Sequence, residues 1–296
     1  MRQVSKPSSS RFFDINGWAF VSVAMGLISV FMLYPIAKSL WMSVQSGQGT
    51  MTKFVGLGNV ERLLDDPMFL RALTNTSIFL VVQVPIMIVL ALVMASCLNI
   101  PNLKGRSLLR TAVFLPCVTS LVAYSVLFKS MFSYDGLVNS TLMELGIISE
   151  SVPWLTDPFW ARVVVILAIT WRWTGYNMVF YLAALQNIDR SIYEAARIDG
   201  VPPWARFTQI TIPLLKPVIL FTTVTSTIGT LQLFDEPYVL TNGGPNNATL
   251  TVGMYLYQNG FKYFDFGYAS AIAYALTLVI VVLGALQMRV MGDRDK

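Results

Sequence analysis

Histidine is absent from this chain of 296 residues, and cysteine occurs only twice. Without histidine there is no catalytic triad that uses it, no histidine metal ligand and no histidine proton relay. Cys97 and Cys117 fall on different apolar segments, and together they provide neither a disulfide framework nor a metal site with paired spacing. We interpret both as packing residues and expect no metal on this chain.

A phosphate-binding loop is also missing. In the pattern GxxxxGK[ST], backbone amides surround the phosphates of a nucleotide and the lysine neutralises them. No glycine in the sequence is followed at this spacing by Gly-Lys. We therefore expect the chain to have no ATPase site of this type and no cofactor of its own.

Charge is scarce as well. Only 12% of the residues are charged and 55% are hydrophobic, whereas a soluble domain of this length needs more charge to cover its surface. A helix of about 20 apolar residues is long enough to cross a bilayer. Such runs lie near 17–41, 72–98, 109–132, 161–185, 216–240 and 266–290. The sequence thus predicts an all-α membrane protein with six transmembrane helices surrounded by lipid.

The basic residues predict the orientation of these helices. They are concentrated in four separate segments that flank predicted spans: 1–16, 99–110, 187–217 and 289–296. Short loops rich in Lys and Arg stay in the cytoplasm, so both termini are expected there. The separation leaves no continuous basic surface for nucleic acid, and we expect no such partner. The predicted parts are a cytoplasmic tail at 1–16, a six-helix transmembrane domain at 17–290 and a cytoplasmic tail at 291–296.

Residues 187–217 form a long polar connection between the fourth and fifth predicted spans. Its length and mixed polarity are unusual between membrane helices, so we expect it to have structure of its own. The sequence predicts a helix over 192–197, whose alanines leave one face small enough for close approach by another protein. Asp199 and Gly200 then predict a turn.

A second short helix is expected to begin at Pro202 and Pro203, because proline fits the first turn of a helix. Pro213 and Pro217 are expected to end it before the fifth span. Composition alone would equally allow an amphipathic segment that lies along the lipid headgroups. The apolar residues of this helix recur at helical spacing: Trp204, Phe207 and Ile210.

The order of residues in 187–217 resembles the EAA loop of binding-protein-dependent ABC permeases. The matching positions are Glu194-Ala195-Ala196, Asp199-Gly200, Phe207, Ile210, Ile212-Pro213 and Pro217. Val201 and Ile212 depart from the alanine and leucine that are usual in the family. The resemblance implies the core of a type I ABC importer, in which this loop docks as a helix–turn–helix onto a cytoplasmic ATPase. The residues implied in coupling to the ATPase are Glu194, Ala195, Ala196, Asp199 and Gly200.

A second pattern resembles carbohydrate-uptake permeases such as those for maltose, lactose and glycerol-3-phosphate. It comprises 240–245 (LTNGGP), Thr249, Tyr255, Phe261 and 267–271 (GYASA). The resemblance implies a permease of the bacterial inner membrane that imports a sugar, an oligosaccharide or a sugar derivative, possibly an anionic one, by alternating access. The implied partners are a second, different permease subunit, two cytoplasmic ATPase subunits that bind ATP and Mg²⁺, and a solute-binding protein.

The resemblance to the maltose permease also implies a set of solute-binding residues. A sugar ring can stack on Trp173 or Tyr176 while Ser226 and Thr230 hold its hydroxyl groups. Ionisable residues within spans usually face a cavity or each other, so they are candidates as well. The full implied set is Arg172, Trp173, Tyr176, Ser226, Thr230, Leu233 and Asp235.

Three alternatives remain open from the sequence. Trp171 and Trp173 could instead belong to the aromatic belt at the membrane surface. Arg172 could pair with Asp235 or Glu236, which is the interpretation that we favour, or it could bind an anionic group of the solute. The chain could also be an ion-coupled secondary transporter, although the two repeated halves common in that class are not visible in the sequence.

Overall fold

The computed structural model describes residues 10–48, 51–100 and 103–292. Most of the tails predicted at 1–16 and 291–296 therefore lies outside the described residues. In the part of the chain that is described, every element except one β-hairpin is a helix. The helical class predicted from the sequence is confirmed apart from this hairpin.

The chain divides into two compact units. The first consists of Met1–Leu63 and Asn259–Tyr274, and the second of Leu64–Gln258 and Ala275–Lys296. Every predicted coupling and solute-binding residue belongs to the second unit.

The first unit contains the first predicted span and the hairpin. An ion pair of 2.7 Å joins Arg62 to Asp265 across 203 positions of sequence, and the Arg62 guanidinium also lies 3.8 Å from the centre of the Tyr268 ring. The two strands pair antiparallel, with Gln45 opposite Phe54. The elements are α1 (Ser10–Ile28), the π-helical turn η1 (Ser29–Leu33), α2 (Tyr34–Ser43), β1 (Gln45–Gln48), β2 (Met51–Phe54), most of α3 (Gly58–Asp65), most of the π-helical turn η3 (Gln258–Lys262) and the start of α14 (Phe266–Met291).

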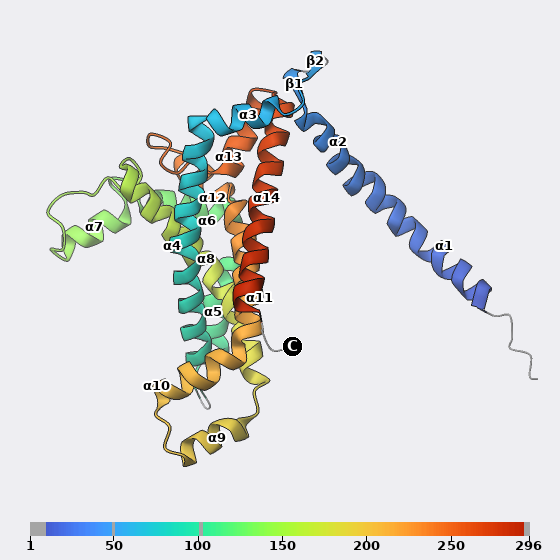
Figure 1. The fold of residues 1–296 in the computed structure, drawn as a ribbon. Helices are drawn as coiled ribbons and strands as arrows, with labels where there is room; N and C mark the ends of the chain where they lie inside the picture. The colour runs from blue at the N-terminus through green and yellow to red at the C-terminus, as the bar shows by residue number, and fades with distance from the viewer. Residues whose placement is uncertain (1–9, 49–50, 101–102, 293–296) are drawn as a thin grey trace, which may run out of the picture. The chain divides into compact units, whose positions relative to one another are not determined.

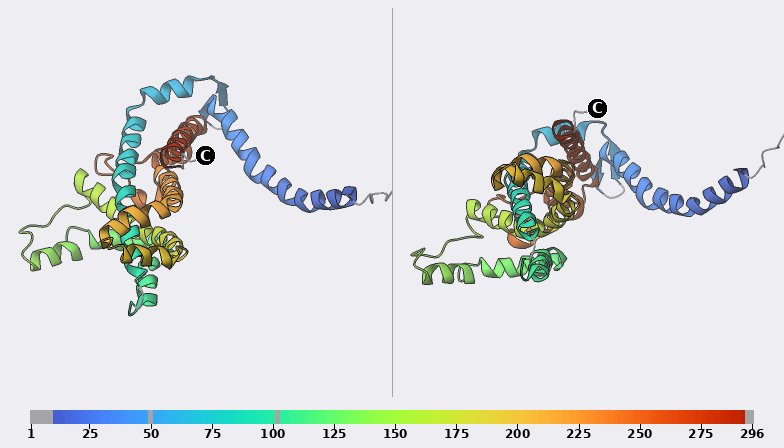
Figure 2. Two further views of the ribbon diagram at one scale, coloured as in Figure 1. Left: turned by 60° about the horizontal axis from the view of Figure 1, so that its bottom comes forward. Right: turned by 90° about the horizontal axis from the view of Figure 1, so that it is seen from below.

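The second unit consists of long helices with short ones at their ends. Its elements are α4 (Pro67–Leu98), α5 (Arg106–Val118), α6 (Leu121–Met131), α7 (Leu137–Glu144), α8 (Pro158–Gln186), α9 (Arg190–Ile198), α10 (Pro203–Arg206), the π-helical turn η2 (Phe207–Thr211), α11 (Ile212–Leu231), α12 (Asp235–Thr241), α13 (Val252–Tyr257) and the rest of α14. α4 and α8 pack along each other, and α11 packs against both. α9 and α10 lie at one end of these helices and α12 and α13 at the other (Figure 1). α7 extends away from them (Figure 2).

The local sequence explains where α4 and α8 begin and why α5 can pack so closely against α8. Asp66 and Asp157 each accept two backbone hydrogen bonds in the first turn of α4 and α8, and each is followed by a proline, which suits that position. Gly175 of α8 lies so near the carbonyl of Val113 in α5 that any Cβ would clash. Small residues allow this close helix contact within membranes.

Five helical segments among the described residues are long and apolar enough to cross a membrane. The third predicted span, 109–132, is instead broken into α5 and α6, which are bent by 97° and would together make a sixth. At the break, the Thr119 carbonyl accepts a hydrogen bond of 3.2 Å from Arg172, and such side-chain bonds replace the missing helical ones. The five segments are Gly17–Ser43, Pro67–Leu98, Pro158–Gln186, Pro203–Leu231 and Phe266–Met291.

The fifth predicted span, 216–240, has different limits from those expected. Helical structure runs without interruption from Pro203 to Leu231 through α10, η2 and α11, so the expectation that Pro213 and Pro217 end a short helix is wrong. The π-helical turn η2 precedes Pro213, and the wider turn accommodates the missing N–H of a proline better than a regular α-turn does. The helix ends instead just before 232–234, and α12 follows as a separate element.

Candidate functional site

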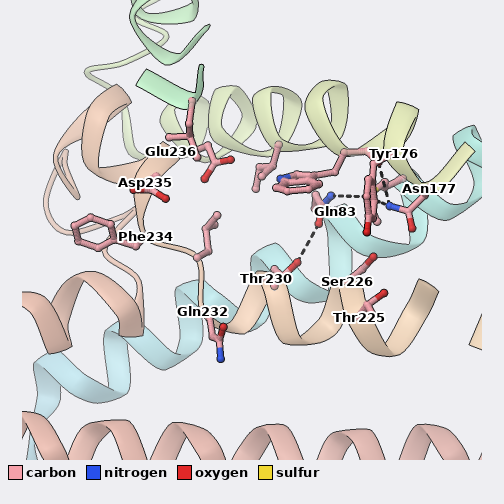
Figure 3. Close-up of a pocket in the computed structure, with 16 residues that line it drawn as sticks. Gln83, Tyr176, Asn177, Thr225, Ser226, Thr230, Gln232, Phe234, Asp235 and Glu236 are labelled. Carbon is pink, nitrogen blue, oxygen red and sulfur yellow. Dashed lines mark hydrogen bonds between the residues drawn. The ribbon is translucent and has the colours of Figure 1, made fainter. Parts of the chain in front are cut away.

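Six of the seven predicted solute-binding residues line a single cavity of about 310 Å³ in the second unit (Figure 3). Two project from α8 and two from α11, because residues three or four positions apart lie on the same side of a helix. Leu233 and Asp235 reach the cavity from the junction at which α11 ends and α12 begins. The six residues are Trp173, Tyr176, Ser226, Thr230, Leu233 and Asp235.

Aromatic rings form one side of this cavity. The rings of Trp173 and Tyr176 meet edge to face with their centres 5.8 Å apart. Trp171 is not among the lining residues, and its ring packs against Tyr124 and Phe128. Trp173 therefore lines the cavity rather than serving only in an aromatic belt.

Polar side chains of α4, α8 and α11 complete the lining. Thr230 donates a hydrogen bond of 3.3 Å from Oγ1 to Oε1 of Gln83. Gln83 is the only polar side chain in the apolar run 78–90, and Asn177 lies one helical turn after Trp173. Both signals were available in the sequence. The polar lining residues that sequence reasoning missed are Gln83, Asn177, Thr225 and Gln232.

Arg172 is the predicted residue that does not line the cavity. Its guanidinium donates to the Thr119 carbonyl and lies 4.7 Å from the centre of the Tyr124 ring. The Tyr124 hydroxyl in turn donates a hydrogen bond of 2.8 Å to Glu236, which is 3% exposed. In the described chain no ion pair joins Arg172 to Asp235 or Glu236, so the direct pairing that we favoured is not formed. Tyr124 lies between the cation and the carboxylate.

The charge of the cavity is acidic. Asp235 and Glu236 contribute carboxylates, whereas no Lys or Arg is found among the described residues that line it. The described chain also holds no cluster of three or more His, Cys, Asp or Glu that could bind a metal ion. The arrangement suits a neutral polar molecule with apolar ring faces.

The coupling loop, which we define as residues 187–217, forms the helix–turn–helix predicted from the sequence. Asp189 caps α9 by accepting a hydrogen bond of 3.0 Å from the Ser191 N–H, and this bond lowers the pKa of Asp189. α9 ends at Ile198, and Gly200 follows with a φ of 72°, which glycine adopts without strain. The hydroxyls of Tyr193 and Thr211 lie 3.1 Å apart and connect α9 to η2.

Four of the five predicted coupling residues are exposed on this loop, and Ala196 is buried. Two large apolar side chains nearby are also exposed, Ile198 by 87% and Trp204 by 74%. Ala196 is covered by its own chain in this arrangement of the loop, and its role in coupling stays a prediction. The exposed residues are Glu194, Ala195, Asp199 and Gly200.

The GGP loop, which we define as residues 242–251, is held by the buried side chain of Asn75 and the partly buried one of Arg162. Asn75 donates from Nδ2 to the carbonyls of Asn247 and Leu250 at 2.8 and 2.9 Å. Arg162 donates to the Ala248 carbonyl at 2.9 Å and to Oδ1 of Asn75 at 3.1 Å. Buried backbone carbonyls need such partners, and here this chain supplies them itself.

Both loops and the cavity are thus features of one helical membrane component. The sequence of residues 67–292 matches the family described as binding-protein-dependent transport system inner membrane component. The chain belongs to this family, and it is therefore a component of the inner membrane that works with a binding protein. Family membership leaves the secondary-transporter alternative without support.

Individual relatives cover nearly the whole chain. The lactose transport system permease protein LacF of Rhizobium radiobacter is 61% identical over 99% of this chain and 100% of its own length. The arabinooligosaccharides transport system permease protein AraP of Halalkalibacterium halodurans is 37% identical over 99% of this chain and 95% of its own. A chain of a bacterial ABC transporter that imports the acidic polysaccharide alginate shares the fold, with a TM-score of 0.84 at 24% identity over 96% of this chain and 97% of that one.

Proposed function

We propose that this chain is the permease subunit through which an ATP-driven importer moves a sugar or a short oligosaccharide into the cytoplasm. The observation that carries the proposal is the cavity, which Trp173 and Tyr176 of α8 line together with Ser226 and Thr230 of α11. Tyr176 lies across from Ser226 and Thr230 (Figure 3). Ring faces and hydroxyl groups are what a sugar needs for binding. The names of the lactose and arabinooligosaccharide relatives agree with this class of solute.

The charge of the cavity favours a neutral solute over a phosphate, sulfonate or uronate. An anion would meet the carboxylate of Asp235 and no Lys or Arg among the described lining residues, so it would be repelled. Arg172 directs its guanidinium towards Thr119 and Tyr124 instead of into the cavity. We assign Arg172 to the stabilisation of the break between α5 and α6.

The proposal includes six spans with both termini in the cytoplasm, α5 and α6 together supplying the broken third span. It also includes a second, different permease subunit and two ATPase subunits that bind ATP and Mg²⁺. The coupling loop would dock onto an ATPase through Glu194, Ala195, Asp199 and Gly200. The exposed Ile198 and Trp204 support this, because large apolar side chains at a surface often mark protein contacts. Alternating access would then expose the cavity to each side in turn.

The test is uptake of radiolabelled lactose by the complete importer in proteoliposomes, with matched tryptophan variants. Trp173→Ala removes a ring that lines the cavity, and we expect it to lower lactose uptake about 10-fold or more, because aromatic stacking area is lost. Trp171→Ala removes a neighbouring ring outside the cavity and is the control. Equal losses in the two variants would contradict the assignment of the cavity. Absence of uptake of any tested sugar by the wild type would contradict the function itself.

A further inference from the structure

Two buried amide side chains lie within otherwise apolar stretches of the central helices. Gln83 of α4 and Asn177 of α8 are each 2% exposed. Burial of an amide in a membrane helix is unfavourable unless its donors and acceptors are bonded. Their hydrogen-bond partners therefore indicate whether the two amides stabilise the fold or remain available to bind a ligand.

These two amides are only partly satisfied within the chain. Oε1 of Gln83 accepts a hydrogen bond of 3.3 Å from Thr230, but other polar atoms of the two side chains have a weak partner or none. Gln83 directs Nε2 at the sulfur of Met87, at 3.3 Å, and Asn177 directs Nδ2 at the same sulfur, at 3.4 Å. A thioether sulfur is a poor acceptor. The Oδ1 atom of Asn177 is buried and has no hydrogen-bond partner in the described chain, although Nδ2 also donates to the Trp173 carbonyl at 3.0 Å.

A buried polar pair that joins α8 and α11 illustrates a purely structural role. Tyr181 lies one turn beyond Asn177 on α8, and its hydroxyl is 2.5 Å from Oγ1 of Thr222. Thr222 also donates to the Val218 carbonyl at 3.0 Å, so this pair is bonded within the chain. Neither residue lines the cavity.

Gln83 and Asn177, by contrast, both line the cavity, as Trp173 does, and both lie next to Tyr176 (Figure 3). We infer that Gln83 and Asn177 bind hydroxyl groups of the transported sugar and set which hydroxyl pattern is accepted. Sugar hydroxyls accept the N–H groups that now point at Met87 and donate to Oδ1 of Asn177. A hydroxyl satisfies all of these groups because it is both a donor and an acceptor.

This inference rests on the proposed function and specifies how the solute is selected. A site that uses buried amides to bind a hydroxyl rejects an analogue that lacks it, since the amides are then left without partners. The aromatic rings provide no such discrimination, because every sugar has apolar ring faces. Selection by hydroxyl pattern is therefore assigned to the two amides, and general affinity to the rings.

The experiment compares lactose with its set of monodeoxy analogues in proteoliposomes that contain the complete importer, its binding protein and ATP. The quantity is the ratio of kcat/KM for lactose to kcat/KM for each analogue. This ratio does not depend on how much variant is inserted, and the contribution of the binding protein is the same for every variant. The variants are Asn177→Leu and Gln83→Met, with Tyr181→Phe as the matched control on α8.

We expect the wild type and Tyr181→Phe to discriminate about 10-fold or more against at least one analogue. Asn177→Leu and Gln83→Met should lower that ratio at least about 3-fold relative to Tyr181→Phe, through a lower kcat/KM for lactose. An unchanged ratio in both amide variants, or a wild type that discriminates against none of the analogues, would overturn the inference while leaving the proposed function intact. Failure of the wild type to import any sugar would overturn the proposed function and the inference with it.

Discussion

The coupling loop and the GGP loop lie at opposite ends of the same long helices, and they are built in opposite ways. The coupling loop leaves Ile198 and Trp204 at the surface. The GGP loop buries its threonines, with Thr249 and Thr251 both fully covered, and its carbonyls accept hydrogen bonds from Asn75 and Arg162. One loop has apolar surface available to a partner, and the other is already bonded to its own chain.

This difference indicates two physical reasons for a sequence motif: contact with a partner protein, or hydrogen bonding within the chain. The EAA-like residues of the coupling loop are mostly exposed, and the proposed docking of a partner there would explain their pattern. The threonines of the GGP loop bond within the chain, since Thr251 donates to the Leu233 carbonyl at 2.6 Å and Thr249 to the Gly244 carbonyl at 2.9 Å. The GGP pattern therefore maintains the junction that places Leu233 and Asp235 in the cavity. Three changes would break or sharpen this comparison.

The largest effect is expected from Asn75→Leu, which removes the partner of the Asn247 and Leu250 carbonyls and one of the two partners of Arg162. Each unsatisfied buried group costs roughly 1–3 kcal/mol, so we expect a loss of about 3 kcal/mol in the free energy of unfolding. Thermal unfolding of the purified importer in detergent measures it. Thr74→Val, which changes the exposed neighbouring residue, is the control. A Tm equal to that of the control would mean that the GGP loop is not held from within.

A smaller effect, confined to assembly, is expected from Glu194→Lys. Reversal of an exposed charge on α9 should weaken retention of the ATPase about 10-fold, while the Tm of the permease subunit changes little. Co-purification from solubilised membranes followed by mass spectrometry measures the bound ATPase and also reveals the second permease. Glu144→Lys, the same reversal on α7, should retain the ATPase. Equal retention of the ATPase by both variants would contradict the proposal that the coupling loop contacts the ATPase.

The smallest effect concerns pH. Hydrogen bonding to Ser191 lowers the pKa of Asp189, so the cap stabilises α9 above the unfolded pKa of about 3.9 and this contribution is lost as pH falls through the lower folded pKa. Hydrogen exchange of α9 should therefore accelerate at strongly acidic pH. Asp189→Asn retains a capping oxygen that does not titrate, and it should remove this acceleration. The same acceleration in the variant would assign it to other groups.

Much of the fold and site was predictable from the sequence, for reasons that particular residues illustrate. Apolar runs locate the long helices, and Asp66 and Asp157 mark where α4 and α8 begin. Tyr176 and Thr230 were found because they match a known pattern at helical spacing. The break at Thr119 was not predictable, because it depends on Arg172 from another helix. The continuity of helix across Pro213 also escaped prediction, since the sequence gives no sign of the π-helical turn before it.

That continuity gives the molecule a single rod between the surface of the coupling loop and the cavity. The helix from Pro203 to Leu231 has 29 residues, which corresponds to about 43 Å at 1.5 Å per residue. Trp204 lies near one end, and Ser226 and Thr230 lie near the other. A push or twist applied at the first end reaches the second without crossing a hinge of loop residues. The stiffness of this helix, as much as the chemistry at either end, would then determine how far a movement of the proposed ATPase partner displaces the residues that line the cavity.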